Sequence, residues 1–179
     1  MSTFTDEEPI RRAEVNRIVE SLGGVVLYGR TAGGYENGFL IIEATRCYHL
    51  GADLACILCS HACCERELAG LLKWQQPATP NAERWGLGRL IRIGRERDWF
   101  DAKLASQLEQ VNENRRTLYH LQDFEAPTGL WRRANSRADN PVTKHDVADA
   151  IPGTLREDAR EALACAFAVR TIEIERQRR

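Results

Sequence analysis

The chain has 179 residues, and its 25 Lys and Arg against 26 Asp and Glu give a net charge of −1. This balance excludes a strongly basic protein that coats nucleic acid and an acidic solvating tail. Hydrophobic residues make up 43% and charged residues 28%, as in a folded globular chain. The length fits one domain, since domains usually hold roughly 100–200 residues.

The sequence also carries signals about compartment. No stretch approaches the ~20 consecutive apolar residues that a membrane span needs. Residues 1–9 lack the basic and apolar segments of a signal peptide. We therefore expect a cytoplasmic protein without membrane contact, whose six cysteines stay reduced.

Helical periodicity begins with a predicted helix over residues 6–22. Thr5 and Glu8 have the spacing of a capping box at its start, and a Gly-Gly pair ends it. The glycine-rich segment 25–38 predicts a connecting loop, because it lacks the Lys-Ser/Thr ending of a phosphate-binding loop. The longest helix is expected next, over residues 43–74.

Prolines and glycines divide the second half of the chain. They predict a connection over 75–82, a short helix over 85–95 and a further helix over 101–119. Residues 122–152 predict an irregular connection that holds at most a turn of helix at its end. A last helix is expected over 154–177.

The predicted fold is all-α, a helical bundle of about four main helices with a long irregular connection before the last helix. Within this single domain, residues 1–38 supply the N-terminal helix and the glycine-rich loop. Residues 39–179 supply the bundle itself.

A charged residue interrupts the apolar face of the predicted helix 101–119. Its stripe, at the spacing of one buried helix face, consists of Leu104, Leu108, Val111 and Leu118. Arg115 falls in the middle of that stripe. A guanidinium placed there must be paired, solvated in a cleft or turned toward another subunit.

The predicted helix 43–74 has a similar interruption, where His61 and Glu65 occupy its apolar face. The economical interpretation is a pair between Glu65 and Arg115, with His61 nearby. Two alternatives stay open: a buried structural network, and apolar stripes that extend past the core to the surface.

Side chains at the end of the helix 101–119 suit cleavage of a phosphodiester. Asn112, Arg116 and His120 form one row at i, i+4 spacing, with Asn114 and Arg115 beside it. An imidazole transfers protons near neutral pH, and a guanidinium stabilises the charge on a phosphate. The alternative is that the helix dipole alone favours a histidine at this end.

At these residues the sequence resembles the HEPN superfamily of small helical bundles. The family signature is an Arg, several residues and then a His at the end of a helix, and here Arg115 and His120 are separated by four residues. The order of elements is similar over about residues 39–177. There a long helix, a short Gly-Leu-Gly-Arg-Leu-Ile helix, the motif helix and a closing helix follow one another.

The resemblance implies a metal-independent endoribonuclease that acts as a toxin, a defence effector or an RNA-processing factor. It implies RNA as substrate, no cofactor, and an antitoxin or another regulatory protein as partner. It also implies a homodimer in which two motifs face each other, so that Arg115 lines a composite cleft.

Carried onto this chain, the resemblance implies that Arg115 binds the scissile phosphate and that His120 is the general acid or base. Asn114 and Arg116 would support them, and the stripe argument adds Glu65 as the residue that orients Arg115. Arg116 stands where family members carry Asn, Asp or His. This difference keeps open a non-catalytic module for dimerisation and for binding a partner protein or nucleic acid.

The cysteines of the predicted helix 43–74 could either bind a metal or pack in the core. Cys56, Cys59 and Cys63 share one helix face with small residues, which predicts close packing against the alanine-rich last helix. A zinc site would need a fourth ligand and a loop knuckle, so we expect no metal.

Two arginine clusters remain, each open to two interpretations. One is Trp131 with Arg132 and Arg133, and the other is the row Arg89, Arg92, Arg95 and Arg97. Each is either a surface for RNA or the solvated face of a loop or helix.

Overall fold

The computed structural model describes residues 7–24, 31–119, 126, 128–137 and 144–177. Within these residues the secondary structure is helical and no strand is present, which confirms the all-α prediction. The helices are α1 (Glu8–Ser21), α2 (Tyr35–His49), α3 (Asp53–Gln75), the 3-10 helix η1 (Ala82–Arg84), α4 (Leu87–Glu96), α5 (Ala102–Tyr119), α6 (Leu130–Arg137) and α7 (Lys144–Gln177).

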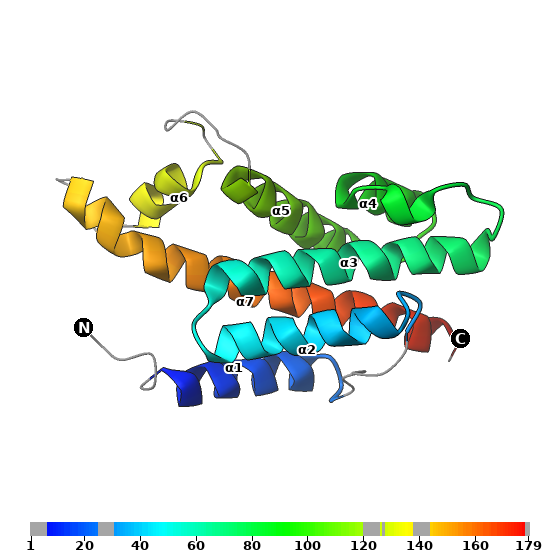
Figure 1. The fold of residues 1–179 in the computed structure, drawn as a ribbon, viewed down its shortest axis with the longest axis horizontal. Helices are drawn as coiled ribbons and strands as arrows, with labels where there is room; N and C mark the ends of the chain where they lie inside the picture. The colour runs from blue at the N-terminus through cyan, green and yellow to red at the C-terminus, as the bar shows by residue number, and fades with distance from the viewer. Residues whose placement is uncertain (1–6, 25–30, 120–125, 127, 138–143, 178–179) are drawn as a thin grey trace.

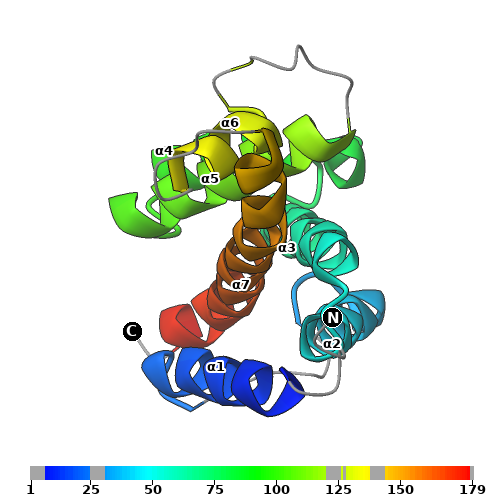
Figure 2. The ribbon, with the colours of Figure 1, turned by 90° about the vertical axis from the view of Figure 1, so that its left-hand side faces the viewer.

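The helices pack around α3 and α7, which run along each other through the middle of the molecule. Figure 1 shows α2 and α1 on one side of this pair and α4, α5 and α6 on the other. Seen from the end, α7 lies between these two groups (Figure 2). Across the described helices, none combines the length and the apolarity needed to span a membrane.

The predicted helix 43–74 is two helices, because the chain reverses at Gly51. Gly51 has φ 74°, a conformation that favours glycine. Its N–H donates to the Tyr48 carbonyl at 3.1 Å, and the Ala52 N–H donates to the Cys47 carbonyl at 2.8 Å. These two bonds form a Schellman motif that ends α2. The apolar period continues through Leu50, so periodicity alone hid the break.

Two further boundaries differ from the prediction. Helix α2 begins at Tyr35, inside the predicted loop 25–38, and the predicted irregular connection 122–152 contains α6 and the first turns of α7. Pro152 lies inside α7 with an exposed ring. The helix continues through it because Val147 and Thr154, on either side, are buried. Tertiary packing thus outweighs the local preference of proline.

The core brings the small-residue faces of α3 and α7 together. The Cys56 thiol donates to the Ala159 carbonyl at 3.6 Å, and Cys63 lies near Arg170 of α7, so the predicted packing on the last helix is confirmed for these two cysteines. Cys59 is only half-buried and lies near Cys47 of α2. All six cysteines are free thiols. Burial raises the pKa of Cys63 and of Cys165 to about 12, which keeps both protonated as small apolar residues.

Helix α1 is fastened to the bundle by charged groups. The Arg11 guanidinium donates to both Asp53 carboxylate oxygens, at 2.5 and 3.1 Å, and to the Tyr48 carbonyl at 3.2 Å. The Tyr48 hydroxyl donates to Glu14, which also pairs with Arg156 of α7 at 3.1 Å. The N-terminal helix is therefore joined to α2, α3 and α7. Its predicted cap, Thr5, lies outside the described residues.

The glycine-rich loop is held on α3 by a fully buried carboxylate. Glu67 accepts hydrogen bonds from the Thr31 hydroxyl at 2.5 Å, the Asn37 amide at 2.6 Å and the Ala32 and Gly33 amides at 3.1 and 3.2 Å. The Arg170 guanidinium of α7 lies 3.8 Å away and is also buried. Burial raises the pKa of Glu67, and these hydrogen bonds oppose that rise.

Gly70 of α3 allows the backbone of the glycine-rich loop to lie directly against the helix. A Cβ added at Gly70 would lie 2.0 Å from the Ala32 carbonyl oxygen, a backbone atom that cannot move alone. Gly70 is one turn after Glu67, so the absence of a side chain and the carboxylate act on the same loop.

Replacing Gly70 by Ala is expected to lower the free energy of unfolding by about 1–3 kcal/mol, the usual cost of overpacking. The matched control is Gly153→Ala, because a Cβ at Gly153 meets nothing within 4 Å. That helical site should gain up to about 1 kcal/mol from the better helix former. Urea unfolding measures both variants, and equal changes in the two would contradict the close approach at Gly70.

Replacing Glu67 by Gln should lower the free energy of unfolding by about 3–5 kcal/mol, because it removes a buried carboxylate that accepts four hydrogen bonds and lies 3.8 Å from the Arg170 guanidinium. The neighbouring Arg66→Gln is the control, since Arg66 and its partner Glu36 are exposed and such pairs contribute about 1 kcal/mol or less. Thermal or urea unfolding of the two variants tests the contrast. A loss in Glu67→Gln as small as that in Arg66→Gln would refute it.

Candidate functional site

The motif helix α5 forms as predicted. The Asp101 carboxylate accepts the Leu104 N–H at 2.7 Å and caps the helix start. Near the other end, Arg115 is half-buried, whereas Arg116 is exposed and pairs with Glu113 at 3.0 Å. The predicted acid or base, His120, lies outside the described residues.

Asn114 faces the last helix. It is buried, and its amide nitrogen donates to Asp158 of α7 at 3.0 Å while its oxygen accepts from Gln110 at 2.7 Å. Arg133 of α6 pairs with the same Asp158. Asn114 and Arg133 therefore hold α5 and α6 on α7, and part of the predicted Trp-Arg-Arg cluster is structural.

His61 and Glu65 belong to a hydrogen-bonded network that joins three helices. The Glu65 carboxylate lies 3.2 Å from His61 Nδ1 on the previous turn of α3. The other ring nitrogen, Nε2, lies 3.2 Å from the Asn112 side-chain oxygen on α5. The second Glu65 oxygen accepts the Leu87 N–H at 3.1 Å and thereby caps α4.

These contacts correct the predicted pair of Glu65 with Arg115. The i, i+4 spacing brings His61 within reach of Glu65, and the positive N-terminal end of α4 attracts its carboxylate. The apolar spacing placed Glu65 on the correct helix face but did not identify the residue that it contacts. Glu65 acts on α5 through His61 and Asn112, and Asn112 lies three residues before Arg115.

His61 is 4% exposed, which favours the alternative of a buried structural network over contact with a substrate. Its Nδ1 faces a carboxylate and its Nε2 faces an amide oxygen. His61 is thus a fastening between α3 and α5.

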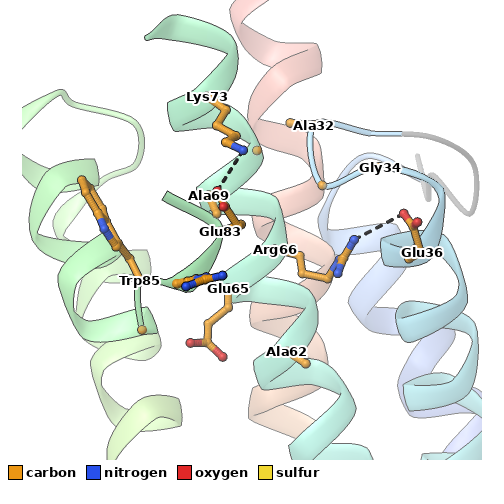
Figure 3. A pocket seen from close by; sticks show the side chains of 14 residues that line it. Ala32, Gly34, Glu36, Ala62, Glu65, Arg66, Ala69, Lys73, Glu83 and Trp85 are labelled. Carbon is orange, nitrogen blue, oxygen red and sulfur yellow. Dashed lines mark hydrogen bonds and ion pairs between the residues drawn. The ribbon is translucent and has the colours of Figure 1, made fainter. Parts of the chain in front are cut away.

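A groove crosses the outer side of α3 beside this network. It has a volume of about 470 Å³ and is lined by residues from three parts of the chain. Ala62, Ala69 and Gly70 of α3 form its small-residue floor, with the loop 32–34 on one side and residues 83–86 on the other (Figure 3).

Both walls of the groove carry charged side chains. Arg66 reaches across to Glu36 at 3.3 Å, and Lys73 reaches Glu83 at 2.8 Å (Figure 3). Glu65 also lines the groove, so the network that caps α4 forms part of its wall. Sequence reasoning missed this groove, because its walls come from segments far apart in the chain.

Comparison with protein-family models, with curated proteins and with solved structures found no match to this chain. In the described part of the chain, no three His, Cys, Asp or Glu side chains gather as they would around a metal ion.

Replacing Glu65 by Ala should lower the free energy of unfolding by about 1 kcal/mol, the usual cost of a lost helix cap. The amide of Leu87 should exchange with solvent faster, because it loses its acceptor. Glu65→Gln is the matched control, since its amide oxygen still accepts the Leu87 N–H. Equal stability and equal Leu87 exchange in Glu65→Ala and wild type would show that the cap contributes nothing.

Proposed function

We propose that this protein is a metal-independent endoribonuclease of the HEPN type, acting in the cytoplasm as a homodimer with a composite Arg/His site. The observation that carries the proposal is the place of Arg115. It is half-buried within an apolar helix face, one turn from the fastened Asn112 and close to the described end of α5 at Tyr119. A guanidinium held in this way suits a phosphate at the edge of a core.

The proposed reaction divides between two side chains. His120 takes the proton of the ribose 2′-hydroxyl, whose oxygen attacks the phosphorus, and the bond to the 5′-oxygen breaks. That oxygen leaves with a proton supplied by an acid, which in a composite site is the partner copy's motif. Arg115 neutralises the charge that grows on the phosphate oxygens. The products are a 2′,3′-cyclic phosphate and a 5′-hydroxyl.

The other predicted residues support the site indirectly. Asn114 positions α5 on α7 through Asp158, and Glu65 positions the same helix through His61. In this proposal RNA is the substrate, and an antitoxin or another regulatory protein controls the enzyme. Its role is that of a toxin, a defence effector or an RNA-processing factor.

A second candidate is a non-catalytic helical module for dimerisation and for binding a partner protein or nucleic acid. The observation that favours it is Arg116, which pairs with Glu113 at the position where the family carries Asn, Asp or His. A cation at that position binds phosphate and transfers no proton at neutral pH.

Incubating the protein with mixed-sequence RNA in EDTA should give fragments with 2′,3′-cyclic phosphate ends. Arg115→Ala and His120→Ala should each slow cleavage by about 10²–10⁴-fold, because each removes a group that acts in the transition state. Arg17→Ala is the control, since Arg17 is exposed on α1. Gel analysis of end-labelled RNA measures all four proteins.

Cleavage that is unchanged in Arg115→Ala and His120→Ala would refute the proposed site. No cleavage by folded wild type, together with RNA binding, would favour the non-catalytic module.

A further inference from the structure

Three exposed arginines lie along α4 and on the turn before it. Arg84, Arg89 and Arg92 are exposed, and none of the ion pairs between described residues includes them. Arg95 of the same helix differs, because it pairs with Glu109 of α5 at 2.6 Å. Arg89 and Arg92 therefore give the exposed side of α4 a positive charge that no ion pair between described residues offsets.

An aromatic ring stands among these arginines. The Arg89 guanidinium lies 3.4 Å from the centroid of the Trp85 ring and covers one of its faces. Trp85 lines the groove on α3, whereas Arg89 does not. Arg89 thus covers one face of the Trp85 ring. Trp85 itself belongs to the wall of the groove (Figure 3).

The groove has room for a flat ligand beside this ring. Its volume of about 470 Å³ lies within the range of roughly 300–1,000 Å³ for small-ligand pockets. Ala62, Ala69 and Gly70 leave the floor low between the side chains of Arg66 and Lys73, which reach to the two walls. A planar group can therefore enter between the loop 32–34 and Trp85.

The carboxylates of the groove are already engaged. Glu36 pairs with Arg66, Glu83 pairs with Lys73, and Glu65 binds His61 and the Leu87 amide. The lining holds these three carboxylates and three cations, Arg66, Lys73 and Arg84, so the surplus positive charge of the region comes from Arg89 and Arg92 of α4 beside the groove. Together with the ring, that charge selects a ligand with a flat base and a phosphate.

We propose that this groove is a subsite for nucleotides of single-stranded RNA, with a base stacked at Trp85 and phosphates bound by Arg84, Arg89 and Arg92. Aromatic stacking combined with a basic track is the usual way to hold a single strand. The choice of RNA as ligand rests on the proposed function. The location of the subsite rests on the geometry of the groove.

A strand fits the arrangement better than a free nucleotide. Arg84 lines the groove, whereas Arg92 lies further along α4 and does not. A ligand that uses both must extend beyond the groove. The subsite is also coupled to the motif helix, because Glu65 in its wall connects through His61 to Asn112, one turn before Arg115.

The test measures binding of a fluorescein-labelled 12-nucleotide single-stranded RNA by fluorescence anisotropy. The His120→Ala background prevents cleavage during the measurement. The triple variant Arg84→Gln, Arg89→Gln, Arg92→Gln is compared with a control that loses the same charge elsewhere on the surface. That control is the triple variant Arg17→Gln, Arg46→Gln, Arg160→Gln.

Each phosphate contact contributes about 0.7 to the slope of log affinity against log salt for a single strand, so loss of three contacts should lower the slope by about 2. Affinity at 150 mM salt should fall at least tenfold relative to the control triple. Trp85→Leu should also weaken binding by about tenfold, with an unchanged salt slope, because stacking carries no charge. Arg95→Gln should bind as the background does.

Equal affinity and equal slope in the two triple variants would overturn the subsite. Competition with AMP, CMP, GMP and UMP distinguishes a site for free nucleotides from a site for an RNA strand. Displacement of the 12-mer by micromolar concentrations of these nucleotides would refute the proposal that the ligand is a strand. Failure of the proposed function shows differently, as RNA cleavage that Arg115→Ala and His120→Ala leave unchanged. The binding experiment thus tests the subsite, and the cleavage experiment tests the proposed function.

Discussion

The buried Glu67 carboxylate is the constraint on which the arrangement depends. A carboxylate without water is costly unless donors surround it, and here Thr31, Asn37 and two loop amides supply them beside Arg170 of α7. The charge therefore forces three segments to one point: the glycine-rich loop, the middle of α3 and the end of α7. Meeting that demand places the loop where it forms one wall of the groove.

Helix α3 divides its surface among three tasks. Its Cys56 contacts α7. Its His61 and Glu65 contact α5 and α4. Its small residues Ala62, Ala69 and Gly70 form the floor of the groove. Glu65 contacts the start of α4 and, through His61, lies next to Asn112 of α5, so one carboxylate of α3 touches both the groove wall and the attachment of the motif helix.

The sequence was sufficient where one helix face determines the outcome. The extent of α5, its Asp101 cap and the packing of Cys56 and Cys63 on α7 follow from spacing and residue size. It was insufficient where distant segments decide. The break at Gly51 lies within an unbroken apolar period, and α7 continues through Pro152 because its neighbours are buried. Glu65 contacts His61 and the N-terminus of α4, and the spacing of apolar residues along α3 does not predict where α4 begins. The groove has no local signature, since its walls meet only in the folded chain.

The link between Glu67 and Arg170, and that between Glu14 and Arg156, also fix when folding can finish. Both join early helices to the last one, so the chain emerges from the ribosome with its closing element still unmade. At about 5–20 residues per second, α3 waits several seconds with its cysteine face and its carboxylate uncovered. Long-range closure of this kind slows folding. The cysteine face and the carboxylate of α3 are therefore covered only after α7 has been made.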